Sequence, residues 1–185
     1  MLLYHTSFNE IKNPDIHYGR KNADFGQGFY LSDDEEFSKR WAKIRKGEDT
    51  YLNRYELNCD DLNIKYLNKN EEWFDYIFRN RQNSKDILSD FDIIIGPIAN
   101  DTIYDTWGII TSGLLDTKTA MKILLIGNTY NQIVIKTDKA INNLHFISSE
   151  ILSNNKIEEY RKTVKKEEKL FQREFVRILE DSDNK

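Results

Sequence analysis

Runs of apolar residues, some continuous and some alternating with polar residues, predict the strands of this chain. They occupy residues 2–6, 29–31, 51–58, 91–98, 132–137 and 144–147. The run at 91–98, FDIIIGPI, is almost continuously apolar, which is typical of a strand buried on both faces. In the run that starts at Gln132, a period of two puts Gln132 on the face opposite Ile133 and Ile135.

Helical spacing of apolar residues predicts the remaining elements. Ser32 followed by Glu35 fits a capping box, and the helix that it begins should run to about Lys46. Phe37 and Trp41, four residues apart, would lie on its apolar stripe. Further helices are expected after residue 100 as far as Trp107, and over residues 71–82, 114–125 and 155–180.

A glycine turn precedes the second strand. Gly26 and Gly28 indicate backbone that turns tightly or lets another group approach closely. Tyr30 follows in the strand, and Ser38 and Trp41, three residues apart, share one helix face. A turn, an inward tyrosine and a hydroxyl beside a flat aromatic ring predict a pocket for a planar ring that carries an amide.

Composition narrows the class of protein. The chain has 185 residues, of which 39% are hydrophobic, so we expect one domain with a substantial core. We place that domain at 1–150 and treat 151–185 as a charged helical extension. The net charge of −4 gives no overall attraction to nucleic acid or to an anionic membrane.

Cysteine, histidine and hydropathy patterns bear on compartment and metals. Cys59 is the single cysteine, which fits a reducing compartment, and no apolar run is long enough for a signal peptide or a membrane span. We therefore expect a soluble, cytoplasmic protein with no membrane partner. His5, His17 and His145 lie far apart without acidic or thiol neighbours at ligand spacing, so we predict no metal site.

Three separated segments carry a family resemblance. LYHTS (3–7) ends a strand on a histidine, FGQGFYLS (25–32) places a tyrosine after the glycine turn, and YNQIVIK (130–136) places a glutamine at the head of a late strand. In this order the chain resembles the poly(ADP-ribose)-polymerase-like ADP-ribosyltransferases of the histidine–tyrosine–glutamate type. More closely, it looks like a bacterial family of uncharacterised domains usually grouped with them. The resemblance covers roughly residues 2–147.

The resemblance implies an NAD site. His5, Tyr30 and Gln132 fall on the three signature positions and are the residues to which it assigns catalysis. Ser38 and Trp41 lie eight and eleven residues after the tyrosine, as in the family. The family stacks the nicotinamide ring on aromatic residues such as Tyr30 and Trp41, bonds its carboxamide to the serine, and bonds the adenosine ribose to the histidine. We add Arg20 as a charged fork for a phosphate.

The sequence departs from the family pattern at two positions. Gln132 stands where the family has glutamate, so it accepts a hydrogen bond without bringing a negative charge. A neutral bond is about half as strong as a charged one, so we expect weaker transition-state stabilisation and no chain elongation. Thr6 replaces the glycine whose backbone holds the carboxamide in the family. Its backbone groups remain, but its branched side chain adds bulk to the site.

Together these features predict an α+β fold with split mixed and antiparallel sheets, flanking helices and a C-terminal helix. The expected activity is mono-ADP-ribosyl transfer from NAD, without a metal, to an unknown macromolecular acceptor. The acceptor should meet the loop at 125–131, including Asn131, and Asn100 and Asp101 are further candidates for the cleft. The resemblance also suggests a toxin or defence effector with an antitoxin or immunity protein.

Other interpretations stay open for the sequence taken alone. NAD glycohydrolysis, or a catalytically weak module that binds NAD or ADP-ribose, would use the same residues. Trp41 on an apolar stripe is equally consistent with core packing, and a helix cap explains Asn100 and Asp101 as well as a cleft does. The charged run at 162–169 has interleaved glutamates and reads as a solvated helix face.

Overall fold

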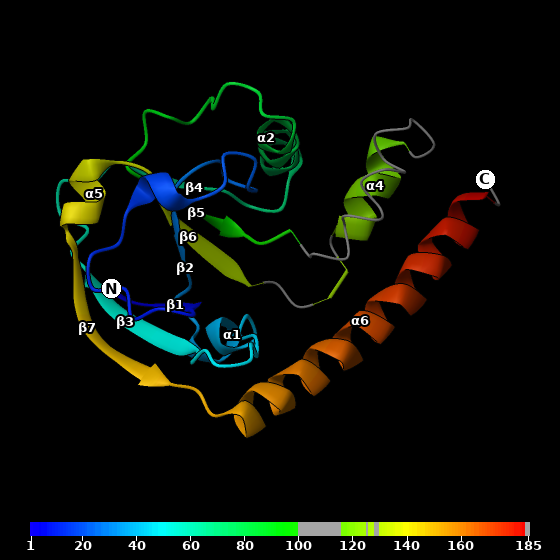
Figure 1. Ribbon diagram of the computed structural model, residues 1–185. Helices are drawn as coiled ribbons and strands as arrows, with labels where there is room; N and C mark the ends of the chain where they lie inside the picture. The colour runs from blue at the N-terminus through cyan, green and yellow to red at the C-terminus, as the bar shows by residue number, and fades with distance from the viewer. Residues whose placement is uncertain (100–115, 125, 128–129, 184–185) are drawn as a thin grey trace.

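The computed structural model describes residues 1–99, 116–124, 126–127 and 130–183, and it has a mixed α+β architecture (Figure 1). The strands are β1 (Leu2–Ser7), β2 (Phe29–Leu31), β3 (Tyr51–Leu57), β4 (Ile64–Tyr66), β5 (Ile93–Pro97), β6 (Asn131–Ile135) and β7 (Leu144–Ile151). The helices are η1 (Ile16–Tyr18), α1 (Glu35–Lys39), α2 (Glu71–Arg81), α4 (Thr117–Leu124), α5 (Asp138–Asn142) and α6 (Asn154–Asp183).

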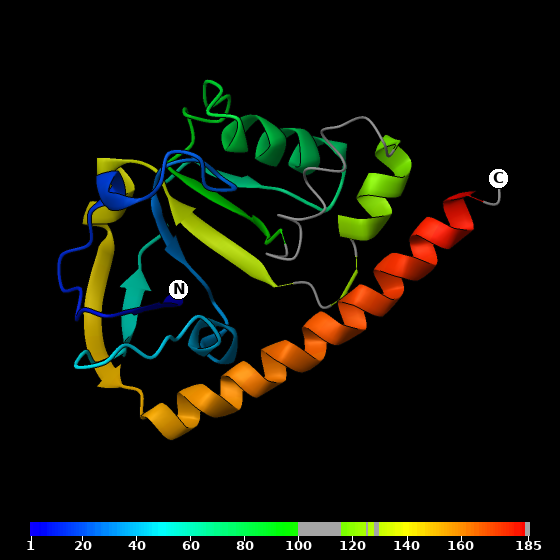
Figure 2. The same cartoon turned by 45° about the vertical axis from the view of Figure 1, so that its right-hand side comes forward.

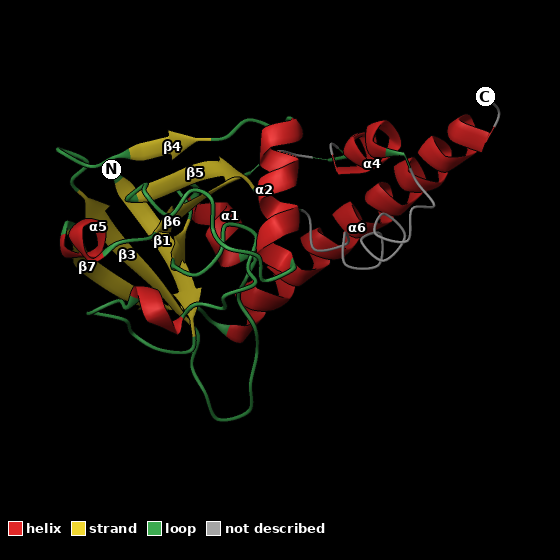
Figure 3. Cartoon of the chain, turned by 90° about the horizontal axis from the view of Figure 1, so that it is seen from above, coloured by secondary structure: helices red, strands yellow, loops and turns green. Residues whose placement is uncertain are grey.

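The strands form two sheets. The first has the order β1-β3-β7 and is antiparallel throughout. The second has the order β2-β6-β5-β4, in which β4 runs parallel to β5 and the other pairs are antiparallel. The view from above in Figure 3 shows the strands grouped at one end and α4 and α6 projecting from the other. The predicted α+β fold with two sheets and a long C-terminal helix is confirmed.

The main core lies between the two sheets. Leu3 and Tyr55 of the first sheet pack with Ile133 and Ile135 of the second, and all four side chains are almost fully buried. Val134, on the opposite face of β6, packs instead into a second cluster beneath α2. The period of two predicted for this strand is therefore confirmed, and the face that carries Gln132 is the α2 side of the sheet.

One isolated bridge joins the two sheets edge to edge. The N–H of Tyr4 donates to the carbonyl of Ser32 at 2.8 Å, and the N–H of Ser32 donates to the carbonyl of Tyr4 at 3.0 Å. Further pairs of residues would be hydrogen-bonded beyond this bridge if β1 and β2 stayed side by side. Since the bridge is a single pair, the two strands separate immediately beyond it.

Helix α1 is much shorter than the sequence predicted. It ends at Lys39 rather than near Lys46, and its N-cap is Asp34, whose carboxylate accepts from the N–H of Phe37. Beyond the helix the backbone tightens, because the N–H of Trp41 bonds to the Ser38 carbonyl three residues earlier. Ala42 is buried with Tyr4 and Leu52, which draws the chain back onto the first sheet and prevents further helix.

Other differences are smaller. The sequence analysis missed β4 and α5, which are only a few residues long, and predicted a β7 that stopped at Ile147. The helix expected from residue 100 to Trp107 lies outside the described residues. The ambiguous segment at 114–125 contains α4, and the predicted tail helix is α6.

Helix α6 begins directly after β7 and crosses the molecule past α1 towards α4 (Figures 1 and 2). Ile157 in its first turn is buried against Tyr4 and Leu152, and Phe171 is buried further along. Among the residues that the structure describes, no helix is both long and apolar enough to cross a membrane.

Gly28 supplies a test of the close packing between the glycine turn and β6. A Cβ added there would lie 2.5 Å from the carbonyl oxygen of Ile135 in β6, a backbone atom that cannot move aside. We expect Gly28→Ala to lower the free energy of unfolding by about 2 kcal/mol or more, measured by chemical denaturation. Gly47→Ala is the control, since its Cβ would meet nothing within 4 Å and only its φ of +80° costs about 1 kcal/mol. Equal losses in the two variants would contradict the close approach.

Candidate functional site

A cavity of about 630 Å³ opens where the two sheets separate. This volume is in the range that holds small-molecule ligands, roughly 300–1,000 Å³. Seven of the residues predicted from the sequence line it, namely His5, Thr6, Arg20, Tyr30, Ser38, Trp41 and Gln132. Asn131 is exposed at the head of β6 and is not among the described residues that line the cavity. Asn100, Asp101 and parts of the 125–131 loop lie outside the described residues.

His5 marks the point where the two edge strands part. In a continued antiparallel ladder, Thr6 would pair with Tyr30, two residues beyond the Tyr4–Ser32 bridge on each strand. Instead, the Nδ1 of His5 lies 2.7 Å from the Tyr30 carbonyl oxygen. The imidazole thus takes the place of a backbone partner and holds the strands apart.

This hydrogen bond also fixes the tautomer of His5. A carbonyl oxygen only accepts, so Nδ1 carries the proton and Nε2 keeps its lone pair. Burial lowers the pKa of His5, more strongly than the bond to Tyr30 raises it, so the ring is neutral at pH 7. The residue therefore offers a hydrogen-bond acceptor, at Nε2, to a ligand hydroxyl.

Thr6 presents its backbone to the cavity and its side chain to α1. Backbone groups alternate sides along a strand, so the N–H and carbonyl of Thr6 lie on the same edge as those of Tyr4, which face the second sheet. The Thr6 hydroxyl donates to the Ser38 carbonyl at 2.7 Å. The branched side chain is thus used to hold α1 against β1.

Tyr30 contributes a fixed aromatic wall. Its hydroxyl donates to the Gly26 carbonyl at 2.7 Å and accepts from the Phe25 N–H at 2.9 Å, so the ring is held by the glycine turn. Gly26 adopts a φ of +71°, a left-handed conformation that fits the tight turn predicted from the sequence. Burial, and secondarily the charge of Asp24, raise the pKa of Tyr30, which keeps the hydroxyl protonated. The ring, rather than an ionised oxygen, is what Tyr30 offers a ligand.

Gln132 is the most unusual side chain in the cavity. Only 8% of the residue is exposed, yet its Nε2 has no hydrogen-bond partner among the described residues. A buried amide donor without a partner costs about 1–3 kcal/mol. Natural proteins keep such groups mainly where a ligand or water completes them. Gln132 therefore points to a ligand atom that accepts a hydrogen bond from this amide nitrogen.

Ser38 and Trp41 come from the end of α1 and the turn after it. Ser38 is 3% exposed, with its hydroxyl 3.4 Å from the Tyr4 carbonyl. Trp41 is 47% exposed, and Phe37, which also lines the cavity, contacts it edge to face with centroids 6.1 Å apart. Trp41 is therefore not a core residue, contrary to the packing interpretation that its spacing allowed.

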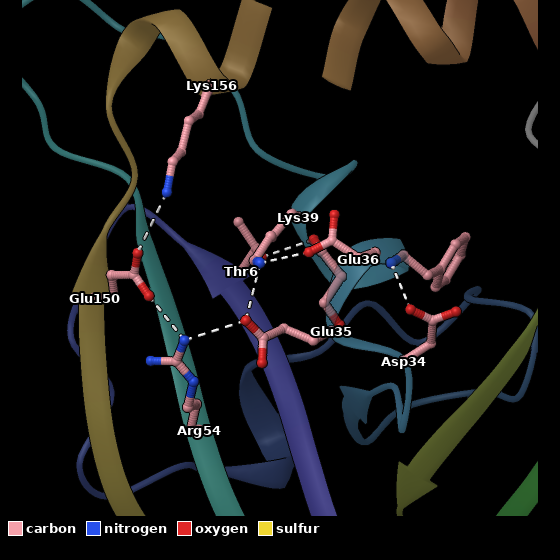
Figure 4. Close-up of polar contacts among 10 residues, drawn as sticks. Thr6, Asp34, Glu35, Glu36, Lys39, Arg54, Glu150 and Lys156 are labelled. Atoms are coloured by element: carbon pink, nitrogen blue, oxygen red, sulfur yellow. Dashed lines mark hydrogen bonds and ion pairs between the residues drawn. The ribbon is translucent and has the colours of Figure 1, made fainter. Parts of the chain in front are cut away.

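A network of ion pairs runs through α1 and joins it to the first sheet at Arg54 (Figure 4). Lys39 pairs with Glu35 at 2.9 Å, and Arg54 of β3 bridges Glu35 at 3.2 Å and Glu150 of β7 at 2.7 Å. Lys39 also pairs with Glu36. A five-residue helix has little stability of its own, so these pairs and the Thr6 bond supply what the helix lacks.

A comparison with known protein families matches this part of the chain. Residues 1–146 match the model of a family described as "Protein of unknown function (DUF3990)". The chain belongs to this family. No match was found among curated proteins. The matched region of this DUF3990 protein contains every described residue that lines the cavity, whereas α6 lies beyond it.

Helix α6 nevertheless reaches the DUF3990 region beside the cavity. Arg40, which follows α1, binds both carboxylate oxygens of Glu167 at 2.8 and 2.7 Å. The same guanidinium lies 4.8 Å from the centroid of the Tyr130 ring, which stacks on Phe37 at 4.3 Å. Tyr130 comes two residues before Gln132, so α6 braces both the α1 wall and the approach to β6.

Three charged residues that line the cavity were missed by the sequence analysis, namely Asp24, Lys43 and Arg81. Asp24 and Arg81 both line the cavity, and their side chains are 18% and 6% exposed. The nearest signal was the position of Arg81, which falls four residues after Ile77 and eight after Trp73 on the buried stripe of α2. A charged residue on a buried stripe usually has a partner, but the sequence did not identify it as Asp24.

The ion pairs around α1 should make stability depend on pH in the acid range. Hydrogen bonds from Lys39 and Arg54 lower the pKa values of Glu35 and Glu150 respectively. A folded-state pKa below the unfolded value of about 4.3 stabilises the fold above that pH. This contribution is lost as the pH falls through the lowered folded values.

We therefore expect the free energy of unfolding to fall between pH 5 and pH 3 more steeply in the wild type than in Arg54→Gln, measured by urea denaturation at each pH. Arg45→Gln is the control, because Arg45 pairs with Glu48 on the exposed surface at 3.5 Å. Parallel pH curves for wild type and Arg54→Gln would contradict the role of the network.

Proposed function

We propose that this DUF3990 protein is a mono-ADP-ribosyltransferase that cleaves NAD at the nicotinamide–ribose bond. The observation that carries the proposal is the convergence of three distant segments on one cavity. His5, Tyr30 and Gln132, whose sequence motifs resemble those of the poly(ADP-ribose)-polymerase-like enzymes, all line it. The buried Gln132 amide nitrogen that lacks a described partner supports a ligand at the same place.

The nicotinamide would occupy the α1 end of the cavity. Its carboxamide needs one acceptor and one donor, which the outward backbone groups of Thr6 supply, and the Ser38 hydroxyl adds a second polar contact. Tyr30, held by two hydrogen bonds, and the exposed ring of Trp41 provide flat surfaces for stacking. These features match a planar ring that carries an amide.

The rest of NAD would use the polar and cationic lining. The bare Nε2 of His5 accepts from a ribose hydroxyl. Arg20 and Lys43 line the cavity as well, so with Arg81 the described lining has three cationic side chains against the one carboxylate of Asp24. The described lining is thus cationic although the whole chain carries −4, which favours a pyrophosphate.

Cleavage of the nicotinamide–ribose bond requires no proton transfer from the protein to the leaving group. Nicotinamide is cationic in NAD and leaves neutral, taking the bonding electron pair, so no general acid is required. The ribose then carries positive charge, as in glycoside hydrolysis. Gln132 would orient a ribose hydroxyl through its amide oxygen, and its neutrality favours transfer of one unit over elongation.

The test is nicotinamide release from NAD by the purified protein, with and without bacterial lysate. We expect release to rise with lysate and to fall at least about tenfold in Tyr30→Ala, because the stacking wall is lost. Gln132→Ala should lower release further. Labelled NAD would then mark the acceptor.

Matched controls are exposed residues of the same type. Tyr18→Ala, at a residue that is 92% exposed, and Gln82→Ala, at an exposed glutamine, should leave release unchanged. If nicotinamide release does not depend on lysate, the protein is an NAD glycohydrolase rather than a transferase. Binding of NAD without any release would replace it with a binding module.

A further inference from the structure

We propose that Asp24 supplies the negative charge that Gln132 does not bring to the reacting ribose. The inference rests on the proposed NAD site and assigns one more residue to it. Among the described residues that line the cavity, Asp24 is the only carboxylate. It lies at the start of the glycine turn that holds the Tyr30 ring, whereas Gln132 lies on β6.

Asp24 is held in a fixed position. Arg81 of α2 contacts its Oδ1 twice, through Nε at 2.8 Å and through Nη2 at 2.6 Å. The Asn80 side chain donates to the Asp24 backbone carbonyl at 3.1 Å, which anchors the turn to the same helix. These contacts involve Oδ1 and the backbone carbonyl and leave Oδ2 without a hydrogen bond among the described residues.

Asp24 lines the same cavity as Tyr30, the ring expected to touch nicotinamide. The charge of Asp24 contributes to the raised pKa of the Tyr30 hydroxyl, and Tyr30 and Gln132 line the same cavity. A carboxylate whose Oδ1 is held by an arginine and whose Oδ2 is open to a ligand is preorganised, because it needs no rearrangement when positive charge develops nearby. Arg81 is thus a positioning residue for Asp24.

The pair is costly as a purely structural feature. Removing two charges from water is expensive, and a buried pair is weak evidence for stability. Asp75 and Arg79 show the inexpensive alternative on the same helix, an ion pair at 2.7 Å with both side chains about half exposed. The placement of the partly buried Asp24 and Arg81 against the cavity is explained if the charge acts on a ligand.

The chemical step balances without any further reagent. The bond from the ribose anomeric carbon to the nicotinamide nitrogen breaks, and its electron pair leaves with neutral nicotinamide. The Asp24 carboxylate stabilises the resulting cationic ribose without bonding to it. An acceptor hydroxyl or amine then bonds to the anomeric carbon and loses its proton to water.

Binding distinguishes this inference from the proposed function. NAD⁺ and NADH differ by one positive charge on the nicotinamide ring, so a nearby carboxylate favours NAD⁺. We expect wild-type protein to bind NAD⁺ more tightly than NADH in calorimetry, and Asp24→Asn to lose about tenfold of that preference. The double variant Asp24→Asn/Gln132→Glu restores a carboxylate from β6 and should recover the preference.

Turnover gives the second readout. Nicotinamide release should fall about a hundredfold in Asp24→Asn, the usual effect of removing one preorganised electrostatic group, and should recover in the double variant. Asp75→Asn is the matched control, since it removes a carboxylate paired with arginine from the exposed side of α2. If Asp24→Asn folds poorly, Asp24→Asn/Arg81→Gln removes both buried charges and should show the same loss of preference.

The outcomes separate the two claims. Binding of both nucleotides with a preference that Asp24→Asn leaves intact would overturn the role of Asp24 while the NAD site stands. If Asp24→Asn/Gln132→Glu recovers neither the NAD⁺ preference nor nicotinamide release, with both variants folded, the claim that a carboxylate at 132 can replace the one at 24 would be overturned. Binding of neither nucleotide by the wild type would overturn the NAD site and this inference with it.

Discussion

The backbone bridge between Tyr4 and Ser32 is the contact on which the site depends. It joins the edges of two sheets whose apolar faces pack together, and it does so for a single pair of residues. If the ladder were longer, the backbone N–H and carbonyl of Thr6 would be hydrogen-bonded to β2 and could not bind a ligand. If the bridge were absent, no backbone hydrogen bond would set the spacing between the two sheet edges. The His5 imidazole ends the ladder by bonding the Tyr30 carbonyl, so one side chain both opens the cavity and offers its other nitrogen to it.

The walls of this cavity are elements too short to be stable alone. Helix α1 has five residues, and its position comes from the Thr6 hydroxyl, the Arg54 ion pairs and the stacking of Phe37 on Tyr130. The Arg40–Glu167 pair extends this bracing to α6. A helix outside the family match therefore contributes to the geometry of a cavity that lies within it. Such dependence ties the conformation of the site to that of α6.

The sequence allowed accurate prediction where the signal was local. The alternation around Ile133 and the glycine turn are set by neighbouring residues, and both appear in the structure. Ser38 and Trp41 both line the cavity, but they do not share a helix face as predicted, because α1 ends at Lys39. The errors have long-range causes. Helix α1 stops early because Ala42 is buried against β1 and β3, and Arg81 enters the cavity because Asp24, 57 residues away, pairs with it. No pattern within either segment contains that information.

The distribution of charge in the cavity lining limits which residue can stabilise a cationic ribose. An amide at position 132 leaves β6 neutral, so a cationic ribose would have to be stabilised from elsewhere in the cavity. Among the described residues of the lining, the glycine turn is where a carboxylate is found. That turn also fixes the Tyr30 ring through the Phe25 N–H and the Gly26 carbonyl. The turn that carries the carboxylate also holds the Tyr30 ring of β2 through two hydrogen bonds, so their relative geometry is set before any ligand enters, which is the condition for electrostatic preorganisation.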